Sequence, residues 1–245
     1  MPLCIIIFII VFLYALFARI LFPKRICKSF DITKTPFREL KMSKEDHNML
    51  ISIMDRLNRL FKEENVINIL IGGSLMGAMR YKNRMPWDDD IDLGIFDSDQ
   101  FERLPFEKYG LSIRKVYFGY KVYDTVHNYS SRLEKTVPFI DIFIYDMIEP
   151  GVYFFRSQKA RDMWPREKLS NIFPTSTCEF SGLLLSCPKN PRLFLDQAYP
   201  GWDKKAYIQG SHTGIPLIRN FEMYITAETT SQVLKYLNKI KIFSP

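Results

Sequence analysis

The chain has 245 residues, of which 47% are hydrophobic and 15% aromatic, so it can bury a substantial core and is not a disordered chain. Its formal net charge of +7 at pH 7 suits an anionic partner such as a nucleotide, a phosphate or a membrane surface. The basic residues are dispersed and form no Lys/Arg-rich arm, so we expect no nucleic-acid partner.

The first segment is strongly apolar. Residues 3–22, LCIIIFIIVFLYALFARILF, contain Arg19 as their one charged residue and match the roughly 20 residues that a bilayer span requires. A cleaved signal peptide is the alternative, but the segment lacks a preceding positive side chain and a clear small-x-small site. We therefore expect an uncleaved anchor in residues 1–29 of a single-pass membrane protein, in the Golgi or ER membrane if the source is eukaryotic. Its orientation stays open: the positive residues after the span favour a cytosolic body, whereas a sequon at Asn128 has meaning only in a lumenal one.

An amphipathic helix is predicted after a basic connector at 24–42. Ser43 is a favourable N-cap, with acidic residues in the first turn. Apolar residues then recur at helical spacing until about Asn65, namely Met49, Leu50, Ile53, Met54, Leu57, Leu60 and Phe61. This stripe predicts core packing, and His47 is expected on the exposed, polar side.

A glycine-serine turn follows the buried strand expected at 66–71. Gly72, Gly73 and Ser74 stand before a short helix expected at 75–81. Glycines at such a junction let the backbone approach a phosphate closely, and the helix N-terminus offers free N–H groups. Ser74 can add a hydroxyl donor, and Gly73 is the position at which a positive φ is expected.

Positive and aromatic side chains that could contact a nucleotide come next in the chain. Arg80, Lys82 and Arg84 are available to balance phosphate charge. Trp87 could stack on a base or a sugar, although packing is the more frequent use of tryptophan.

Four aspartates occur within five residues at the start of a strand expected at about 90–96. If residues 88–92 are extended, Asp88, Asp90 and Asp92 point to one face, because side chains alternate along a strand. Their carboxylates can then converge on one or two hard cations such as Mg2+ or Mn2+, which would offset the repulsion between them. Asp89 would point away as a solvated or loop-capping residue. The opposite, core-facing side would carry Ile91, Leu93 and Ile95.

A further carboxylate lies inside the apolar strand expected at 137–145. Asp141 is flanked by Phe139, Ile140, Ile142 and Phe143, and an unpaired carboxylate there is costly unless a cation is near. We therefore add Asp141 to Asp88, Asp90 and Asp92 as a metal ligand. Asp146, at the end of the strand, is a weaker candidate.

The remaining segments mix strands and helices without strict alternation. Helices are expected near 98–109, 156–168, 190–201 and 226–240, strands at 111–126, and a hairpin that turns at Ser181-Gly182. The pattern predicts an α+β fold with a mixed sheet. Cys178 and Cys187 bracket the hairpin, so a local disulfide and two separate core thiols both fit.

The stretch 72–95, GGSLMGAMRYKNRMPWDDDIDLGI, resembles the signature of the LicD/fukutin family, which has the nucleotidyltransferase fold of DNA polymerase β. The segments WPREKL at 164–169 and FSGLLLSCPKNPRLFLDQAYPGW at 180–202 are also similar, and the resemblance extends from about 45 to 212. It implies a mixed sheet flanked by helices, within a catalytic domain that we place at residues 30–245.

This resemblance also implies roles for individual residues. Gly73 and Ser74 would hold nucleotide phosphates. Gly72, Arg80, Lys82 and Trp87 are added as substrate-binding residues from the residue pattern described above. The catalytic carboxylates would be Asp90, Asp92 and Asp141, and the role of Asp88 is left open, as is that of His212, which could line the site or cap a turn.

The reaction implied is metal-dependent transfer of a phospho-alcohol, such as phosphocholine or ribitol phosphate, from a CDP-activated donor to a hydroxyl of a glycan or glycoconjugate. Two alternatives remain. A catalytically inactive family member could act as an accessory or scaffold in glycan modification, or the enzyme could be a nucleotidyltransferase that moves NMP. The sequence leaves the donor alcohol, the acceptor and the oligomeric state open.

Overall fold

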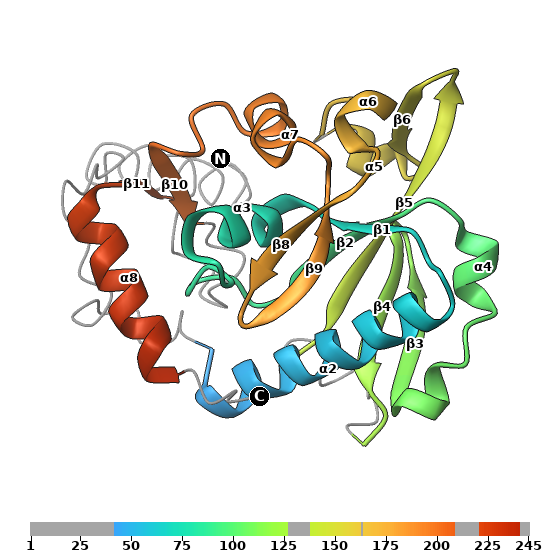
Figure 1. Ribbon diagram of the computed structural model, residues 1–245, viewed down its shortest axis with the longest axis horizontal. Coiled ribbons are helices and arrows are strands. Elements are labelled where there is room, and N and C mark those ends of the chain that lie inside the picture. Colours follow the sequence, from blue (N-terminus) through green and yellow to red (C-terminus); the bar gives the residue numbers. More distant parts are fainter. Residues whose placement is uncertain (1–41, 127–137, 163, 209–220, 241–245) are drawn as a thin grey trace, which may run out of the picture.

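The computed structural model describes residues 42–126, 138–162, 164–208 and 221–240 (Figure 1). Within these ranges, no helix combines the length and the apolar character needed to cross a membrane. The predicted anchor at 3–22, the sequon at Asn128 and His212 lie outside the described residues.

A mixed β-sheet organises the described part of the chain. Its central strands are ordered β1-β2-β5-β4-β3, and β2 and β5 are parallel whereas the other neighbours are antiparallel. The long β5 also pairs with β6, which pairs with β7. The bounds are β1 Asn68–Leu70, β2 Ile91–Ile95, β3 Leu111–Val116, β4 Gly119–Asp124, β5 Ile140–Glu149, β6 Val152–Phe155 and β7 Glu167–Lys168. The predicted α+β class with a mixed sheet is confirmed.

One face of the sheet packs against the first helix of the described chain. Ser43 caps α2 (Lys44–Glu63) as predicted, since its Oγ accepts a hydrogen bond from the N–H of Asp46 at 3.0 Å. The predicted helix at 98–109 is divided by Pro105 into α4 (Ser98–Glu102) and a 3-10 helix, η2 (Phe106–Tyr109). The buried residues of this face include Ile91, Leu93, Ile95, Ile140, Ile142 and Ile144, as expected for β2.

The opposite face carries an aromatic cluster around Phe143. The ring of Phe143 lies 4.5 Å from that of Phe118 and 5.5 Å from those of Phe155 and Trp164. A helix over 156–168 was a wrong prediction: α5 (Gln158–Arg161) is a single turn. Pro165 disfavours helical backbone at Trp164 and lacks the N–H that a continuing helix needs, and β7 follows instead. Two further helices, α6 (Leu169–Ile172) and α7 (Pro191–Ala198), complete this side.

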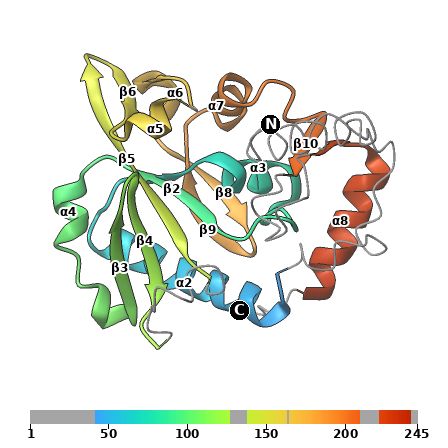
Figure 2. The same cartoon turned by 180° about the vertical axis from the view of Figure 1, so that it is seen from behind.

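A hairpin and a C-terminal helix lie beyond the sheet. The hairpin of β8 (Ser176–Phe180) and β9 (Leu183–Cys187) turns at Ser181 and Gly182 as predicted, contacts β1 and α3, and is crossed by a Cys178–Cys187 disulfide. Both views show α3 (Gly72–Tyr81) between the sheet and α8 (Ala227–Ile240) (Figures 1 and 2). The strands β10 (Lys205–Ile208) and β11 (Phe221–Tyr224) form a separate antiparallel pair.

Candidate active site

The glycine-serine motif forms the first turn of α3 rather than a turn before it. The helix begins at Gly72, three residues earlier than predicted, and its first intrahelical hydrogen bond joins Leu75 N–H to Ile71 O at 3.0 Å. The N–H groups of Gly72, Gly73 and Ser74 therefore have no acceptor within the helix. The positive φ expected at Gly73 falls instead on Gly72, where φ is +55°.

Both glycines lie directly against carboxylates. A Cβ built on Gly72 would lie 2.8 Å from Asp92 Oδ2, and one built on Gly73 would lie 2.6 Å from Asp88 Oδ2. Any side chain at these positions would have to displace an aspartate. The glycines therefore allow the start of α3 and the acidic residues to occupy the same small region.

Ser74 connects α3 to β2. Its buried Oγ accepts a hydrogen bond from the Asp92 N–H at 2.8 Å, and Ile71 N–H donates to Asp92 O at 3.2 Å. The Ser74 hydroxyl still has its own proton to donate. The side chain predicted to bind phosphate thus also fixes the backbone of an acidic residue.

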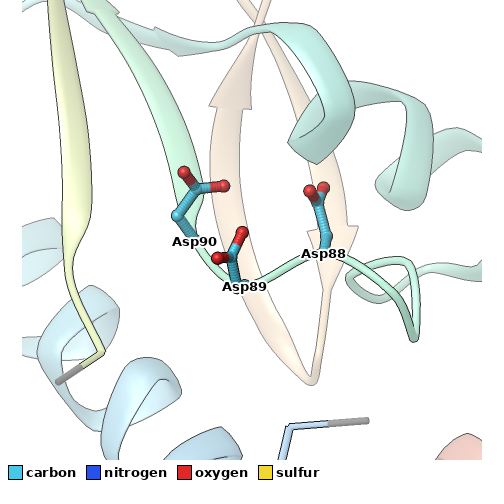
Figure 3. Close-up of side chains that lie close together, drawn as sticks. All are labelled: Asp88, Asp89 and Asp90. Atoms are coloured by element: carbon cyan, nitrogen blue, oxygen red, sulfur yellow. The ribbon is translucent and has the colours of Figure 1, made fainter. Parts of the chain in front are cut away.

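The acidic run leads into the strand expected at about 90–96. The strand β2 starts at Ile91, so Asp88, Asp89 and Asp90 lie on the loop before it (Figure 3). The alternation that was considered for residues 88–92 therefore applies within the strand only to Ile91 and Asp92. Asp89 is exposed as expected, but the three residues can each place one carboxylate oxygen within 4.8 Å of the other two.

A second group of carboxylates forms across two parallel strands. Asp92 of β2 is directly opposite Asp141 of β5, and one oxygen each from Asp90, Asp92 and Asp141 lie within 4.8 Å of one another. Asp141 is only 7% exposed. Asp90 belongs to both groups, and carboxylate oxygens at this spacing could hold a hard divalent cation. The structure thus brings together the four residues that were predicted as metal ligands.

Burial and neighbouring charges act together on Asp92. Burial raises the pKa of its carboxyl well above the usual range, and the charges of Asp90, Asp141 and Asp88 raise it further. Lys121 acts in the opposite direction. A positive charge among these aspartates would therefore stabilise the ionised cluster.

Lys121 is a member of the site that the sequence analysis missed. It is opposite Asp141 in the register of β4 and β5, and its Nζ donates to Asp141 Oδ1 at 2.7 Å. In the sequence, Lys121 follows buried Tyr120 and precedes buried Val122. A lysine on the polar face of an otherwise buried strand was the available signal, but its pairing with Asp141 depends on a register that the sequence does not specify.

The three basic residues after the glycine motif contact protein groups. Arg80 Nη2 donates to the carbonyl oxygens of Trp202 and Lys205, the latter at 2.7 Å. Lys82 is exposed and forms an ion pair with Glu179 at 3.0 Å. Arg84 is fully buried. Phosphate binding by Arg80 and Lys82 stays a prediction. The expectation that Arg84 is available to phosphate is wrong, because its side chain is buried.

Arg84 organises the loop that carries the acidic run. Its Nη1 donates to the carbonyl oxygens of Met85 at 3.0 Å, Pro86 at 3.3 Å and Asp88 at 2.7 Å, while its Nε donates to His47 Nδ1 at 2.9 Å. The prediction that His47 is exposed is wrong, because the imidazole is buried as the acceptor for this arginine. Burial and the charge of Arg84 lower the pKa of His47 to about 4. Arg84 is thus a positioning residue for the acidic loop.

The other two candidates are Trp87, which directly precedes Asp88, and Asp146. Trp87 is 6% exposed and belongs to the hydrophobic core, which fits the packing alternative, and its stacking on a base or sugar stays a prediction. Asp146 forms an ion pair with Arg156 at 2.7 Å near the outer end of β5.

The fold and the site together define an α+β domain in which a glycine-rich helix start faces carboxylates from neighbouring parallel strands. The chain belongs to the LicD/FKTN/FKRP family: the family model of its nucleotidyltransferase domain matches residues 65–190, half of the chain. This match includes the glycine-serine motif, Lys121 and the four predicted metal ligands, Asp88, Asp90, Asp92 and Asp141.

The chain is also similar to curated proteins, one of which carries the LicD name. The chain is 28% identical to the uncharacterized protein RP689 of Rickettsia prowazekii, over 76% of this chain and 67% of that protein. It is 24% identical to the lipopolysaccharide cholinephosphotransferase LicD of Haemophilus influenzae, over 73% of this chain and 82% of that protein. Among solved structures, ANT(2")-Ia in complex with adenylyl-2"-tobramycin aligns at a TM-score of 0.38 and 12% identity, over 57% of this chain and 68% of that chain.

Proposed function

We propose that this protein is a metal-dependent phosphotransferase that moves a phospho-alcohol, of the phosphocholine or ribitol phosphate type, from a CDP-activated donor to a glycan hydroxyl. The observation that carries the proposal is the convergence of Asp90, Asp92 and Asp141 at the N-terminus of α3, inside the domain that the family model matches. The similarity to a lipopolysaccharide cholinephosphotransferase supports this reaction class.

The start of α3 is suited to the phosphates of the donor. The N–H groups of Gly72, Gly73 and Ser74 point out of the helix end, where the helix dipole favours negative charge. The adjacent carboxylates would repel a diphosphate on their own. A cation between the carboxylates and the phosphates would make the two compatible.

The residues present fit a divalent cation such as Mg2+ or Mn2+. The donor set consists of carboxylate oxygens within 4.8 Å of one another, which is the ligand chemistry of these ions. Asp90, Asp92 and Asp141 would hold the ion, with Asp88 as a further ligand. When bound, the ion supplies positive charge that stabilises the oxygens of the transferring phosphoryl group.

The reaction itself is a substitution at phosphorus. The acceptor hydroxyl oxygen forms a bond to the phosphorus that carries the alcohol, the bond from that phosphorus to the bridging oxygen breaks, and CMP leaves with the electron pair. The hydroxyl proton passes to a carboxylate of the cluster. The N–H groups at the start of α3 bind and orient the donor throughout this step.

Donor screening tests the proposal. The protein is incubated with CDP-choline, CDP-ribitol or CDP-glycerol, each with Mg2+ or Mn2+ and a glycan acceptor, and both CMP and the modified glycan are measured. Metal-dependent appearance of both products with one donor is expected. Transfer of NMP instead would favour a nucleotidyltransferase, and no turnover with any pair would favour an accessory protein.

Matched variants of one strand make this test specific. Asp141→Asn removes a carboxylate of the cluster, whereas Asp146→Asn removes the carboxylate that pairs with Arg156 outside it. The first variant should abolish CMP release and the second should leave it close to the original rate. Equal activity of the two variants would contradict the assignment of Asp141.

The proposal includes a place in the cell. An anchor in residues 1–29 would hold the domain at a membrane, close to lipid-linked or membrane-bound glycoconjugates. The apolar run at 3–22 supports this part of the proposal.

A further inference from the structure

Lys121 is buried against the carboxylate cluster. Its side chain is 16% exposed and that of Asp141 is 10% exposed, with 2.7 Å between Nζ and Oδ1. The neighbouring strand offers a contrast, because the Lys115–Glu102 pair has exposures of 75% and 45%. Exposed pairs contribute little to stability, whereas removal of one partner from a buried pair leaves an uncompensated charge.

The position of Lys121 is fixed by more than its ion pair. Backbone register aligns Lys121, Asp141 and Asp92 in a row across β4, β5 and β2. The Nζ atom also lies 3.3 Å from the ring centroid of Phe139 and 5.6 Å from that of Phe118. Aromatic faces attract an ammonium group, so the rings help to hold the cation beside Asp141.

The positive charge of Lys121 lies at the edge of the carboxylate cluster, because its Nζ donates to Asp141 and Asp141 is directly opposite Asp92. One lysine cannot offset the charges of Asp88, Asp90, Asp92 and Asp141 together. The site is therefore built with part of the positive charge that it needs.

We propose that Lys121 is a positioning residue that substitutes for part of the metal charge, holding Asp141 in place before the divalent cation binds and weakening the affinity of the cluster for that cation. This inference rests on the proposed function, since it takes the cluster as the metal site. According to this inference, Lys121 allows the protein to fold and to keep its site intact without metal. It also predicts that metal binding and the lysine charge compete for the same carboxylates.

Thermal unfolding of the full chain in EDTA and during Mg2+ titration tests this inference without an activity assay. Lys121→Met retains an apolar chain against Phe118 and Phe139 but removes the charge. Its melting temperature in EDTA should fall by roughly 5–10 °C, because Asp141 loses its buried partner. Saturating Mg2+ should then raise the melting temperature more in this variant than in the original protein, with a lower half-saturating concentration. Lys115→Met, the exposed control, should change neither quantity.

A double variant distinguishes lost charge from lost packing. If Lys121→Met does not fold in EDTA, combining it with Asp141→Asn should restore folding, because neither charge is then left without its partner. A double variant that also fails to fold would show that Lys121 acts through packing, and the inference would be overturned.

The failure of this inference can be told apart from failure of the proposed function. An equal Mg2+ increment in the original protein and in Lys121→Met would overturn the role of Lys121 alone. No response of the original protein to Mg2+ or Mn2+ would remove the metal site itself, and the role of Lys121 with it.

Discussion

Burial raises the pKa values of two carboxyl groups, Asp92 and Glu167, but neighbouring like charges raise that of Asp92 further. Asp92 is crowded by other aspartates at the start of α3. Glu167, on β7, is 2% exposed, and its Oε2 has no hydrogen-bond partner among the residues that the structure describes. Burial alone raises the pKa of Glu167 to about 8. Like charges add to the effect of burial at Asp92, whereas burial acts alone at Glu167.

The difference indicates what each region can do. A cluster of carboxylates gains stability from a cation, so the region around Asp92 is suited to binding one. A single carboxyl in apolar surroundings gains most by staying protonated, so the region around Glu167 has no comparable attraction for a metal. The same direction of pKa shift therefore marks a candidate binding site in one place and a cost in stability in the other.

The largest effect is expected in the cluster of aspartates around Asp92. Asp92→Asn removes a charged ligand and should lower turnover on the order of 10³-fold or more, since several kcal/mol of transition-state stabilisation are lost. The same change relieves repulsion, so the melting temperature in EDTA should be unchanged or higher. Asp90→Asn should behave in the same way. Turnover close to that of the original protein in either variant would break the assignment of this region as the metal site.

The carboxyl of Glu167 should instead affect the stability of the protein in a pH-dependent manner. The unfolded pKa of Glu167 is near 4.5 and its folded pKa is about 8, so the folded state binds more protons between these values. Stability is then lost as pH rises from about 5 to 8, by up to about 1.4 kcal/mol per pH unit. Glu167→Gln stays neutral and should remove this dependence.

Unfolding of Glu167→Gln in urea at pH 5 and pH 8 checks this expectation. The two proteins should differ little at pH 5, and the variant should be the more stable one at pH 8. Activity with a saturating donor should be retained. A variant that shows the same slope with pH as the original protein would mean that Glu167 is ionised in the folded state.

The sequence was sufficient for the parts of the site that local pattern decides. Alternation of apolar and acidic residues assigns Asp92 and Ile91 to opposite faces of a strand, and the structure agrees. The cap at Ser43 and the turn at Gly182 are also local, and both were predicted. Such features depend on a few neighbouring residues and on backbone geometry.

Long-range contacts explain what the sequence analysis missed. The partner of Asp141 is set by the register of β4 on β5, which is formed by residues 20 positions apart. Arg84 and His47 are polar in sequence but are buried because they satisfy each other across a separation of 37 residues. Gly72 and Gly73 have low helix propensity, so they predicted a turn, and tertiary contact with Asp88 and Asp92 places them in a helix.

A smaller effect is expected at Ser74, which connects α3 to the backbone of Asp92. Ser74→Ala removes the acceptor for the Asp92 N–H and should destabilise the protein by about 1–3 kcal/mol, with weaker metal binding because Asp92 is less well fixed. Ser98→Ala is a suitable control, since Ser98 Oγ accepts from Arg156 Nη1 at 2.9 Å and is also buried. Urea unfolding should show a loss for both variants. Calorimetry with Mg2+ should show weaker binding for Ser74→Ala only, and equal binding in both would limit Ser74 to a structural role.

The smallest effect on stability is expected at Gly73. A Cβ there meets Asp88 Oδ2, the end of a side chain that can move, so Gly73→Ala should cost little stability. The same Cβ projects where the donor's phosphates would meet the start of α3, and the affinity for the CDP-alcohol should fall by about tenfold, or about 1.4 kcal/mol. Calorimetric titration of the donor with Mg2+, alongside thermal unfolding without it, measures the two quantities separately. Loss of donor affinity at constant stability would extend the binding site from the carboxylates to the helix start. Unchanged affinity would place the phosphates elsewhere, and the glycine would then serve only to let Asp88 approach α3.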